Sequence, residues 1–582
     1  MDLSLEQRLL RFLEREEDGE RRQQDDLRAL SIEDRVLEGE CIDGAEVVGR
    51  DAEGFVLRVG ENLAKFREGD AVLAGDGLEF QRGAPLVYVG FDAETGMLRL
   101  APDPFLRSAP SELTLGKRYC IDRRSLNLRS RLHEAVHQAF ADPRIGAVLE
   151  GSLAVPRNAE REGRARQALS GCDLDAAQQR AGALAIATDG LTLVQGPPGT
   201  GQTSLLAAVV ATLVRAGCRI ALSAFTHRAV DNALFALRKL DADLQLFKVV
   251  GGGEPSPELS HARVQQVRAG RGRLGLPAKG AVVAGTCFQL LKLPATERFH
   301  YAVFDEAGQL PIPHALAGML LSPRWLFFGD HQQLPPVITC EHQDRESTAS
   351  VFERFHALYG SALLDTTYRM NDGVCRIVSE LFYAGKLHPD PAVGARRMRF
   401  VPGGSLDEVL DPDKPVVIAR VDHAQPGSRS SEEANLCADL VDEAVRRHRV
   451  PPAEIAVVAP FRAQVRAIRS ALQRKATPGA DAIVVDTVER IQGQEREVVI
   501  LSLTSGDPES LNARASFFFS TNRLNVSLSR ARTKAIVVAS QGAFAALPMD
   551  VASLRAASTF KRLRKLVPQV DLTAIYGAKG GE

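Results

Sequence analysis

The sequence predicts an α/β protein that contains two doubly wound parallel sheets, preceded by a helical stalk and a small β-barrel. Three observations predict this fold class: two series of short apolar runs, helix-forming stretches between the runs, and a β-rich texture near the N-terminus. Continuous Val, Ile and Ala runs separated by helices are typical of parallel strands covered on both faces. The runs of the first series are 191–195, 219–223, 281–285, 301–305 and 325–329, and those of the second are 415–420, 455–459, 482–486, 498–503 and 535–539.

Residues 4–30 predict the stalk, because they are rich in charge, place leucines at helical spacing and contain no glycine before Gly19. A solvated helix without a partner is an equally good interpretation of this segment alone. Short β-type runs with intervening Gly and Asp predict the barrel at about 35–105, and a second helix is expected at about 122–141. The expected domains are 1–172 for stalk and barrel, 173–348 and 349–545 for the two α/β units, and 546–582 for a C-terminal tail, of which 561–582 are expected to be partly disordered.

Bulk composition excludes several classes of protein. The 582 residues are 45% apolar and 25% charged, which is ordinary for a soluble globular chain of several domains. No apolar run reaches membrane-spanning length and the acidic N-terminus does not resemble a signal peptide, so no membrane partner is expected. The eight cysteines are dispersed without a C-x-x-C pair, which favours reduced thiols in a cytoplasm over a structural zinc site. Because the net charge is −1, any nucleic-acid partner must be held by a local cleft.

Residues 196–203, with the sequence GPPGTGQT, follow the first strand and precede a helix-forming stretch at 204–216. They match the phosphate-binding loop G-x-x-x-x-G-K-[ST], whose backbone N–H groups surround phosphate oxygens, except that Gln202 replaces the lysine. The order of strand, loop and helix favours a phosphate site over a glycine-rich turn without a ligand. The residues expected to bind ATP here are Gly196, Gly199, Thr200, Gly201, Gln202, Thr203 and Ser204, with the Thr203 hydroxyl also on Mg²⁺.

Acidic and amide side chains follow two later strands of the first series. Asp305 ends the strand 301–305, where it is placed to hold Mg²⁺, and Glu306 can polarise the attacking water as a general base. A solvated strand end is the usual interpretation of such a pair, and the upstream phosphate loop makes it the weaker one here. Gln333, in GDHQQLPP, is a candidate to orient water or contact the γ-phosphate, although a proline-rich turn also explains that segment.

Three segments of the second half supply the positive charge that the phosphate loop lacks. Tyr368 and Arg369 place a ring beside a guanidinium, 486–495 follows a strand, and 523–532 contains Arg530. Arginines that reach a γ-phosphate from a second domain make domain closure depend on the nucleotide state. Each arginine taken alone is more often a surface charge.

In this order, the motifs resemble those of superfamily 1 helicases of the Upf-like branch, whose two α/β domains are RecA-like. The matching segments are LDAAQ (174–178), GPPGTGxT, THRAVDN (226–232), GT (285–286), DEAGQ, GDHQQLPP, YRMN, APFRAQ (459–464), VDTVERIQGQE and RLNVSLSRAR. They cover about 173–540, and the family's N-terminal stalk and barrel also fit 1–172. The resemblance implies an ATP- and Mg²⁺-dependent motor that moves 5′-to-3′ on single-stranded DNA or RNA. We expect this motor to be a cytoplasmic monomer.

The resemblance also implies a role for each matching residue. Gln178 and Tyr368 would hold adenine, and Glu489 is counted with the ATP-binding residues. Thr203 and Asp305 would bind Mg²⁺, and Glu306 would activate water. The residues that would sense the γ-phosphate are Gln333, Arg369 and Arg530. Those that would line the nucleic-acid path are Thr226, Asn232, Thr286, Pro460 and Thr487.

Two features depart from the family pattern. The interval 252–280 is short and glycine-rich, and its basic residues are Arg263, Arg268, Arg271, Arg273 and Lys279. We expect a flexible basic loop near the nucleic-acid strand, and an ordinary solvated loop is an equal alternative. Many relatives carry a helical subdomain at this place, and its absence would weaken duplex separation. In addition, the sequence contains no Cys/His-rich regulatory domain.

Gln202 is expected to slow hydrolysis more than it weakens binding. It donates only a neutral hydrogen bond, whereas hydrogen bonds that involve a charged group are about twice as strong. The transition state carries more charge to neutralise, and loss of one such contact costs on the order of 10²–10³ in rate. Two other functions stay open: an ATP-gated clamp on nucleic acid that does not translocate, and a P-loop kinase for small molecules, which the arginine-bearing second domain disfavours.

Overall fold

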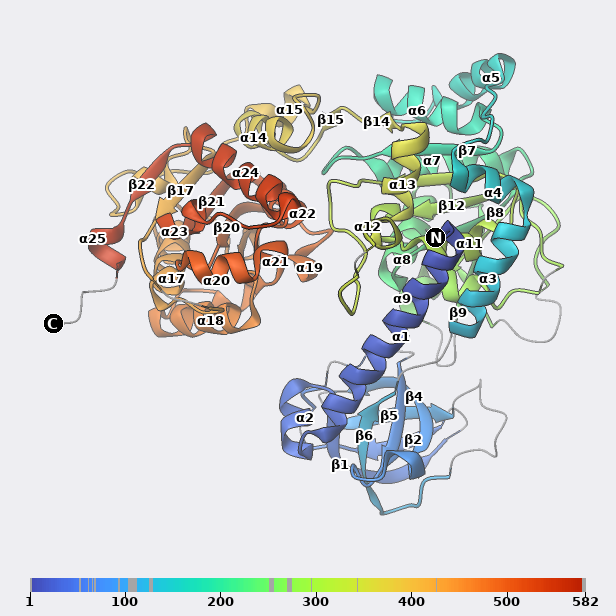
Figure 1. Ribbon diagram of the computed structural model, residues 1–582, viewed down its shortest axis with the longest axis horizontal. Coiled ribbons are helices and arrows are strands. Elements are labelled where there is room, and N and C mark those ends of the chain that lie inside the picture. Colours follow the sequence, from blue (N-terminus) through green and yellow to red (C-terminus); the bar gives the residue numbers. More distant parts are fainter. Residues whose placement is uncertain are drawn as a thin grey trace.

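The computed structural model describes residues 3–51, 54–60, 62–64, 66, 70–92, 95–102, 112–124, 129–250, 256–268, 275–294, 296–342, 344–424 and 427–577. Within these ranges the chain forms a closed β-barrel and two α/β domains with parallel sheets, which confirms the predicted fold class (Figure 1). None of the helices in these ranges has the length and apolar character that crossing a membrane requires.

Helix α1 (Leu5–Ala29) is the predicted stalk, and it connects the first α/β domain to the barrel (Figure 1). Ser4 and Gln7 form a capping box at its start, which satisfies the first N–H groups of the helix. Near this end Leu9 and Phe12 are buried in the apolar cluster of the first α/β domain. At the other end the Arg28 guanidinium lies 5.0 Å from the ring centre of Phe80 in the barrel. The stalk therefore has a partner at each end.

The barrel contains six antiparallel strands in the order β1–β2–β5–β4–β3–β6. Its elements are α2 (Ile32–Glu38), β1 (Cys41–Arg50), β2 (Phe55–Arg58), β3 (Ala71–Gly75), η1 (Phe80–Arg82), β4 (Ala84–Asp92), β5 (Met97–Pro102) and β6 (Arg118–Arg123). The predicted limit at about 105 is too early, because β6 pairs with both β1 and β3 and so closes the barrel. The helix expected from about 122 consequently begins at Arg129.

The three helices that follow the barrel pack on the first α/β domain and not on the barrel. They are α3 (Arg129–Ala141), α4 (Pro143–Glu150) and α5 (Ala159–Leu169). Val136 of α3 and Val148 of α4 share an apolar cluster with Trp325 of the first sheet, and Leu169 of α5 packs in the cluster of the next helix, α6. The structure therefore moves the predicted boundary at 172 back to about 129, because the apolar faces of these helices are buried on the sheet.

The first α/β domain is built on an eight-stranded parallel sheet in the order β10–β9–β11–β8–β12–β13–β7–β14. All five predicted strands are present; β9 and β10 extend the sheet on one side and β14 on the other. The elements are α6 (Ala176–Ala187), β7 (Leu191–Gln195), α7 (Gln202–Arg215), β8 (Arg219–Ala224), α8 (His227–Leu240), β9 (Gln245–Val250), α9 (Pro257–His261), β10 (Gln265–Arg268), β11 (Ala281–Thr286), α10 (Cys287–Leu290), β12 (Tyr301–Asp305), η2 (Ala307–Gln309), α11 (Ile312–Met319), β13 (Trp325–Gly329), α12 (Arg345–Thr348), α13 (Val351–Tyr359) and β14 (Ala362–Leu363).

Two sequence expectations for this domain are corrected. The boundary at 348 lies too early, because Phe352 and Phe355 of α13 are fully buried in its core and β14 pairs with β7. The interval 252–280 is not simply a loop, since its described part forms α9 and β10, and β10 extends the sheet. Of its basic residues, Arg271 and Arg273 lie outside the described residues.

The second α/β domain contains a six-stranded parallel sheet in the order β19–β18–β20–β21–β17–β22. Its elements, including a small two-stranded sheet at the entry, are β15 (Thr366–Thr367), α14 (Asp372–Phe382), β16 (His388–Pro389), α15 (Pro391–Gly394), α16 (Asp407–Leu410), β17 (Val416–Arg420), α17 (Ser431–Arg446), η3 (Pro452–Glu454), β18 (Ile455–Val458), α18 (Arg462–Lys475), η4 (Ala480–Ala482), β19 (Val484–Asp486), α19 (Val488–Ile491), β20 (Arg496–Ser502), α20 (Pro508–Ala513), α21 (Ala515–Phe518), α22 (Thr521–Leu528), β21 (Ala531–Ala539), α23 (Gln541–Ala545), α24 (Val551–Leu566), β22 (Gln569–Asp571) and α25 (Thr573–Tyr576).

The predicted tail at 546–582 is mostly part of this second domain. Phe560 and Leu563 of α24 are buried in its core, and β22 pairs with β17 as a sixth strand. An amphipathic helix with a buried face cannot be a free tail, so the expectation of disorder from 561 is wrong as far as residue 577. Residues 578–582 lie outside the described residues.

Candidate nucleotide site and nucleic-acid cleft

The candidate nucleotide site lies at the carboxyl ends of three adjacent strands, β12, β13 and β7. The phosphate loop joins β7 to α7, a helix of 14 residues, so the positive end of the helix dipole faces the loop. Gly199 has a φ of 77°, and a Cβ added there would lie 2.5 Å from Cβ of Arg369. Glycine is thus required at this position, because the loop packs directly against the segment that enters the second domain.

Gln202 points across the loop toward the end of β12. Its Nε2 donates a hydrogen bond of 2.9 Å to Oδ1 of Asp305. The side chain also fills the space beside Gly196, where an added Cβ would lie 2.3 Å from its Oε1. The residue that replaces the lysine therefore holds the carboxylate that was predicted to bind Mg²⁺.

Asp305 and Glu306 form an acidic pair in which Asp305 is buried and Glu306 is half-buried. Burial, and then the neighbouring Glu306, raise the pKa of Asp305 to about 7, and burial raises the pKa of Glu306 as well. Two adjacent carboxylates whose pKa values are both raised are relieved by a hard divalent cation. The acidic pair thus fits Mg²⁺, and Thr203, the other predicted ligand, lies in the first turn of α7.

Glu306 is held in a conformation that a non-glycine residue seldom adopts. Its φ is 52°, in the left-handed region, and Gln309 donates a hydrogen bond of 3.0 Å to its Oε2. Such strain is characteristic of functional positions. The side chain also experiences the positive charge of Arg530, which acts to lower its pKa.

Gln333 links the phosphate loop to Asp330, the residue that follows strand β13. Its Nε2 donates to the carbonyl of Gly196 over 3.3 Å and to Oδ2 of Asp330 over 3.1 Å. The Asp330 carboxylate in turn accepts a bond of 2.9 Å from Gln195, the residue before the loop. The predicted water-orienting residue therefore lies against the loop, at the buried end of a polar network.

Two arginines of the second domain, Arg369 and Arg530, lie near this site. Arg369 donates to Oε2 of Glu495 over 2.7 Å and to the carbonyl of Ser529 over 3.0 Å. Arg530 is 3% exposed; burial, and then the nearby charge of Arg369, lower its pKa to about 9, while Glu306 acts in the opposite direction. Both guanidiniums are thus fixed on the second domain, and Arg530 is close enough to Glu306 to influence its charge.

The two residues predicted to hold adenine, Gln178 and Tyr368, both form hydrogen bonds with Asp175. Gln178 is buried, forms a capping box with Asp175 and donates 2.8 Å from Nε2 to the carbonyl of Thr200. The Tyr368 hydroxyl donates to Oδ2 of Asp175 over 2.8 Å, and its backbone N–H donates to Gly199. The structure therefore brings both residues to the edge of the phosphate loop. Ser204 is exposed on the first turn of α7.

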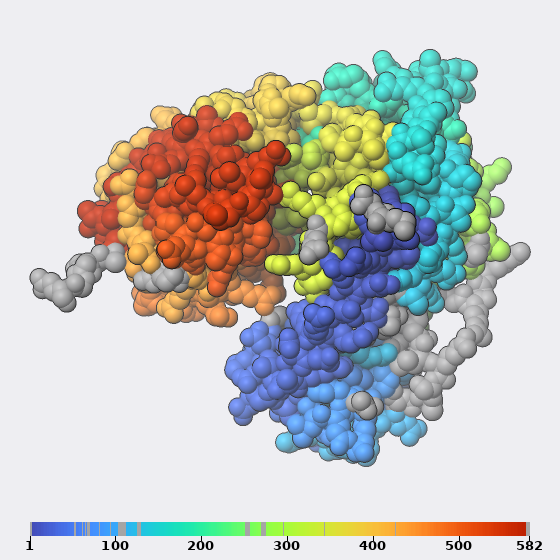
Figure 2. Space-filling view, in the orientation of Figure 1, coloured from blue at the N-terminus to red at the C-terminus, as the bar shows by residue number. Residues whose placement is uncertain are grey.

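A cleft of about 790 Å³ lies between the barrel and the second domain (Figure 2). Its walls include three of the predicted residues, Pro460, Thr487 and Glu489. From the second domain Arg462, Arg490 and Phe517 also line it, and from the barrel Glu40, Ala64, Phe66, Asp70 and Arg123. Cationic side chains beside aromatic rings are suited to a phosphodiester strand with exposed bases.

The remaining predicted strand-contacting residues lie on the first domain. Thr226 and Thr286 are the N-cap residues of α8 and α10, at the carboxyl ends of the neighbouring strands β8 and β11. Asn232 is exposed on α8. The five predicted path residues are therefore divided between the two α/β domains.

Glu489 is placed differently from its predicted role in binding ATP. It lines the cleft and accepts a hydrogen bond of 2.9 Å from Nε of Arg523. It is Glu495, six residues further on, that contacts Arg369. Glu489 and Glu495 both belong to the motif VDTVERIQGQE, but the linear sequence does not indicate which of the two carboxylates lies toward the nucleotide site.

A contact between the domains was also missed. The Tyr383 hydroxyl, at the end of α14, donates a bond of 2.6 Å to Oδ2 of Asp330 and accepts one of 2.8 Å from Asn525. Asn525 and Asn522 of α22 also donate to backbone carbonyls of the segment after β13, at Gln332 and His331. The phosphate loop is thus connected to the second domain through Gln333 and Asp330.

Comparisons with known proteins find matches over parts of both α/β domains. Two family models described as AAA domain match residues 173–271 and 347–542. The chain is 26% identical over 401 residues to the DNA replication ATP-dependent helicase/nuclease JHS1 of Arabidopsis thaliana, covering 65% of this chain and 29% of that protein. It is 28% identical over 368 residues to the DNA replication ATP-dependent helicase/nuclease DNA2 of Gallus gallus, covering 60% and 34%. The chain belongs to the Upf-like branch of the superfamily 1 helicases.

The match to these curated relatives of the helicase family spans about a third of their length. Among solved structures, the arterivirus nonstructural protein 10 helicase is 14% identical with a TM-score of 0.35, covering 92% of this chain and 82% of that chain. A structural similarity with so low a TM-score supports no conclusion about fold or function. The assignment of this superfamily 1 chain to two RecA-like domains rests on its own parallel sheets and phosphate loop.

Proposed function

We propose that this chain is an ATP-driven translocase on single-stranded nucleic acid, moving 5′-to-3′, whose hydrolysis is slowed by Gln202. The observation that carries the proposal is a nucleotide site shared by two domains. The first domain contributes the phosphate loop and the acidic pair, and the second contributes Arg369 and Arg530. Because the domain that carries the arginines also forms one wall of the cleft, closure on ATP would move that wall along a bound strand.

In the proposed mechanism, the chain's own residues bind and orient ATP and one water. The phosphate loop holds the phosphates, and Mg²⁺ on Thr203 and Asp305 would neutralise charge between them. Glu306 accepts the proton of the attacking water, and Gln333 orients that water. Arg369 and Arg530 stabilise the charge that develops on the γ-phosphate.

The first experiment measures ATP hydrolysis by the full chain and by Gln202→Lys, with and without single-stranded DNA or RNA of the same sequence. The lysine variant is expected to hydrolyse ATP on the order of 10²–10³ faster in the presence of the strand. Gln202→Ala is the matched control, and it should hydrolyse ATP no faster than the natural chain, because it too brings no charge. Removal of streptavidin from either end of a biotinylated strand then tests the direction.

An ATP-gated clamp is the second candidate function. It is favoured by the bond from Gln202 to Asp305, since that bond occupies the carboxylate without adding positive charge. The clamp predicts ATP-dependent strand binding and no turnover even in Gln202→Lys. The names of the relatives favour DNA as the strand, and DNA and RNA binding curves measured side by side test that preference.

A further inference from the structure

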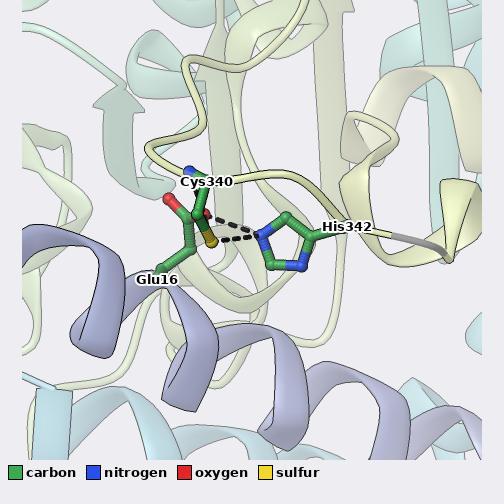
Figure 3. A group of neighbouring side chains, drawn as sticks. All are labelled: Glu16, Cys340 and His342. Atoms are coloured by element: carbon green, nitrogen blue, oxygen red, sulfur yellow. Dashed lines mark hydrogen bonds and ion pairs between the residues drawn. The ribbon is translucent and has the colours of Figure 1, made fainter.

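We propose a zinc site that joins the stalk to the first α/β domain, formed by Glu16, Cys340 and His342 (Figure 3). Glu16 lies near the middle of α1, and the other two residues lie on the segment that leaves β13. The proposal does not depend on the proposed function, because none of the three residues lies among the nucleotide or cleft residues.

The three side chains already converge on one point. Nε2 of His342 lies 2.7 Å from Oε1 of Glu16, and Sγ of Cys340 lies 3.2 Å from that oxygen and 3.4 Å from Nε2. Zn–N and Zn–O bonds of about 2.0–2.2 Å and a Zn–S bond of about 2.3 Å separate tetrahedral ligands by about 3.3–3.6 Å. The sulfur is nearly at that separation, and the carboxylate and the imidazole need to part by about half an ångström.

The surroundings hold the ligands in place. Oε2 of Glu16 accepts a bond of 2.7 Å from the backbone N–H of Thr339. Oε1 accepts one of 3.3 Å from the backbone N–H of Cys340 and faces the other two side chains. The ring of Phe12 lies 4.8 Å from that of His342, and the His342 side chain is only 3% exposed. Gly19 leaves room for Cys340, since an added Cβ would lie 3.1 Å from Cys340 Cβ.

The donor set identifies the class of metal. One thiol, one imidazole and one carboxylate suit zinc, whereas Mg²⁺ and Ca²⁺ prefer oxygen donors alone. Three protein ligands leave a fourth tetrahedral position for water. The sequence could not indicate this site, because Glu16 is 324 residues from Cys340 and the pair Cys-x-His is not the C-x-x-C spacing of structural zinc sites.

A second cluster of two carboxylates and a histidine does not have the geometry of a metal site. Asp407, Glu443 and His448 lie together, but Nε2 of His448 is 3.9 and 4.0 Å from the two carboxylates. Its Nδ1 accepts a bond of 3.0 Å from the N–H of Val401, so the ring proton is on Nε2, where a metal would need a lone pair. This cluster therefore suits a bridging water and not zinc.

Zinc at the Glu16 site would fix the stalk to the segment after β13. That segment contains Gln333, next to the phosphate loop, and the carbonyls that accept from Asn522 and Asn525. Through α1 the same site would set the position of the barrel, which forms one wall of the cleft. The metal would thus join two parts of the chain that are distant in sequence.

The test uses the full chain, freed of metal and titrated with Co²⁺ as a spectroscopic probe for zinc. One equivalent of Co²⁺ is expected to give the thiolate-to-cobalt charge-transfer band and the visible bands of tetrahedral Co²⁺, and added Zn²⁺ should displace both. Cys340→Ser should abolish the charge-transfer band, and Glu16→Gln should weaken binding at least tenfold. Cys172→Ser, at another partly buried thiol, is the matched control and should behave as the natural chain.

Other outcomes would overturn the proposal. These are a titration without a charge-transfer band, and Co²⁺ or Zn²⁺ affinities that are equal in Cys340→Ser and Cys172→Ser. The conservative Glu16→Gln variant keeps the volume of the side chain, so it separates loss of a ligand from loss of the fold. Zinc should also raise the melting temperature of the natural chain and of Cys172→Ser, and leave that of Cys340→Ser unchanged.

Discussion

At the scale of single residues, the two glutamates of VDTVERIQGQE provide a sharp test of the nucleotide site. Glu495 positions Arg369 through a bond of 2.7 Å, whereas Glu489 lines the cleft. In the Gln202→Lys background, we expect Glu495→Ala to lower strand-stimulated ATP hydrolysis by about 10- to 100-fold, since a hydrogen bond to a charged group contributes about 1.5–3 kcal/mol. Glu489→Ala, measured in the same assay at saturating strand, should leave the maximal rate within about twofold of its parent. Equal losses in both variants would mean that Glu489 belongs to the nucleotide site.

The same pair illustrates which parts of the site can be predicted from the sequence. Asp305, Gln333 and the phosphate loop could be brought together in advance, because each follows a buried strand and parallel strands end at one edge of the sheet. Neither the direction of Glu495 nor the role of Tyr383 could be predicted in this way. Tyr383 ends an amphipathic helix and resembles a core residue, and its partner Asp330 is 53 residues away on another domain.

At the scale of elements, the strands that were predicted are those with continuous apolar runs. The strands missed in the first sheet lie at its edges or next to one. Strand β9, beside the edge strand β10, contains Lys248, which is buried and pairs with Asp231 at 2.6 Å, and the edge strand β14 has two residues. Helix α24 falls in the segment predicted to be a tail, because its sequence is rich in basic residues and its apolar face is narrow. Periodicity alone does not say whether such a face meets a partner.

Phe560 of α24 should therefore contribute strongly to the stability of the second domain. It is 2% exposed and its ring packs against Phe518 and Phe519 at 6.2 and 5.3 Å. Phe560→Ala is expected to cost about 3–5 kcal/mol through the cavity it leaves. Leu554→Ala, on the exposed face of the same helix, should cost less than about 0.5 kcal/mol.

Urea unfolding can assign this loss to one domain. The chain has a single tryptophan, Trp325, buried in the first α/β domain, so its fluorescence reports on that domain, whereas far-UV circular dichroism reports on both. Phe560→Ala should lower the midpoint of a circular dichroism transition and leave the Trp325 midpoint unchanged. A dispensable tail would instead give two unchanged midpoints.

At the scale of the whole molecule, the network through Tyr383 couples the nucleotide site to the arrangement of the domains. Tyr383→Phe removes the hydroxyl that donates to Asp330 and accepts from Asn525 while keeping the ring. Because the bond to a carboxylate contributes about 1.5–3 kcal/mol, we expect the variant to open the domains and enlarge the radius of gyration in solution scattering. Tyr576→Phe, which loses a bond to Asp439 within the second domain, is the control and should scatter as the natural chain does.

The cleft between the barrel and the second domain makes a prediction that needs no hydrolysis. Arg462, at the start of α18, lines the cleft, and Arg474 lies twelve residues further on the same helix, about 18 Å away along its axis. Reversing the charge in Arg462→Glu should weaken binding of single-stranded DNA at least tenfold and reduce the slope of log affinity against log salt by about 0.7, the effect of one lost phosphate contact. Arg474→Glu changes the net charge by the same amount and should alter neither quantity. If both reversals weakened binding equally, the strand would be attracted by overall charge, and the cleft would not be its path.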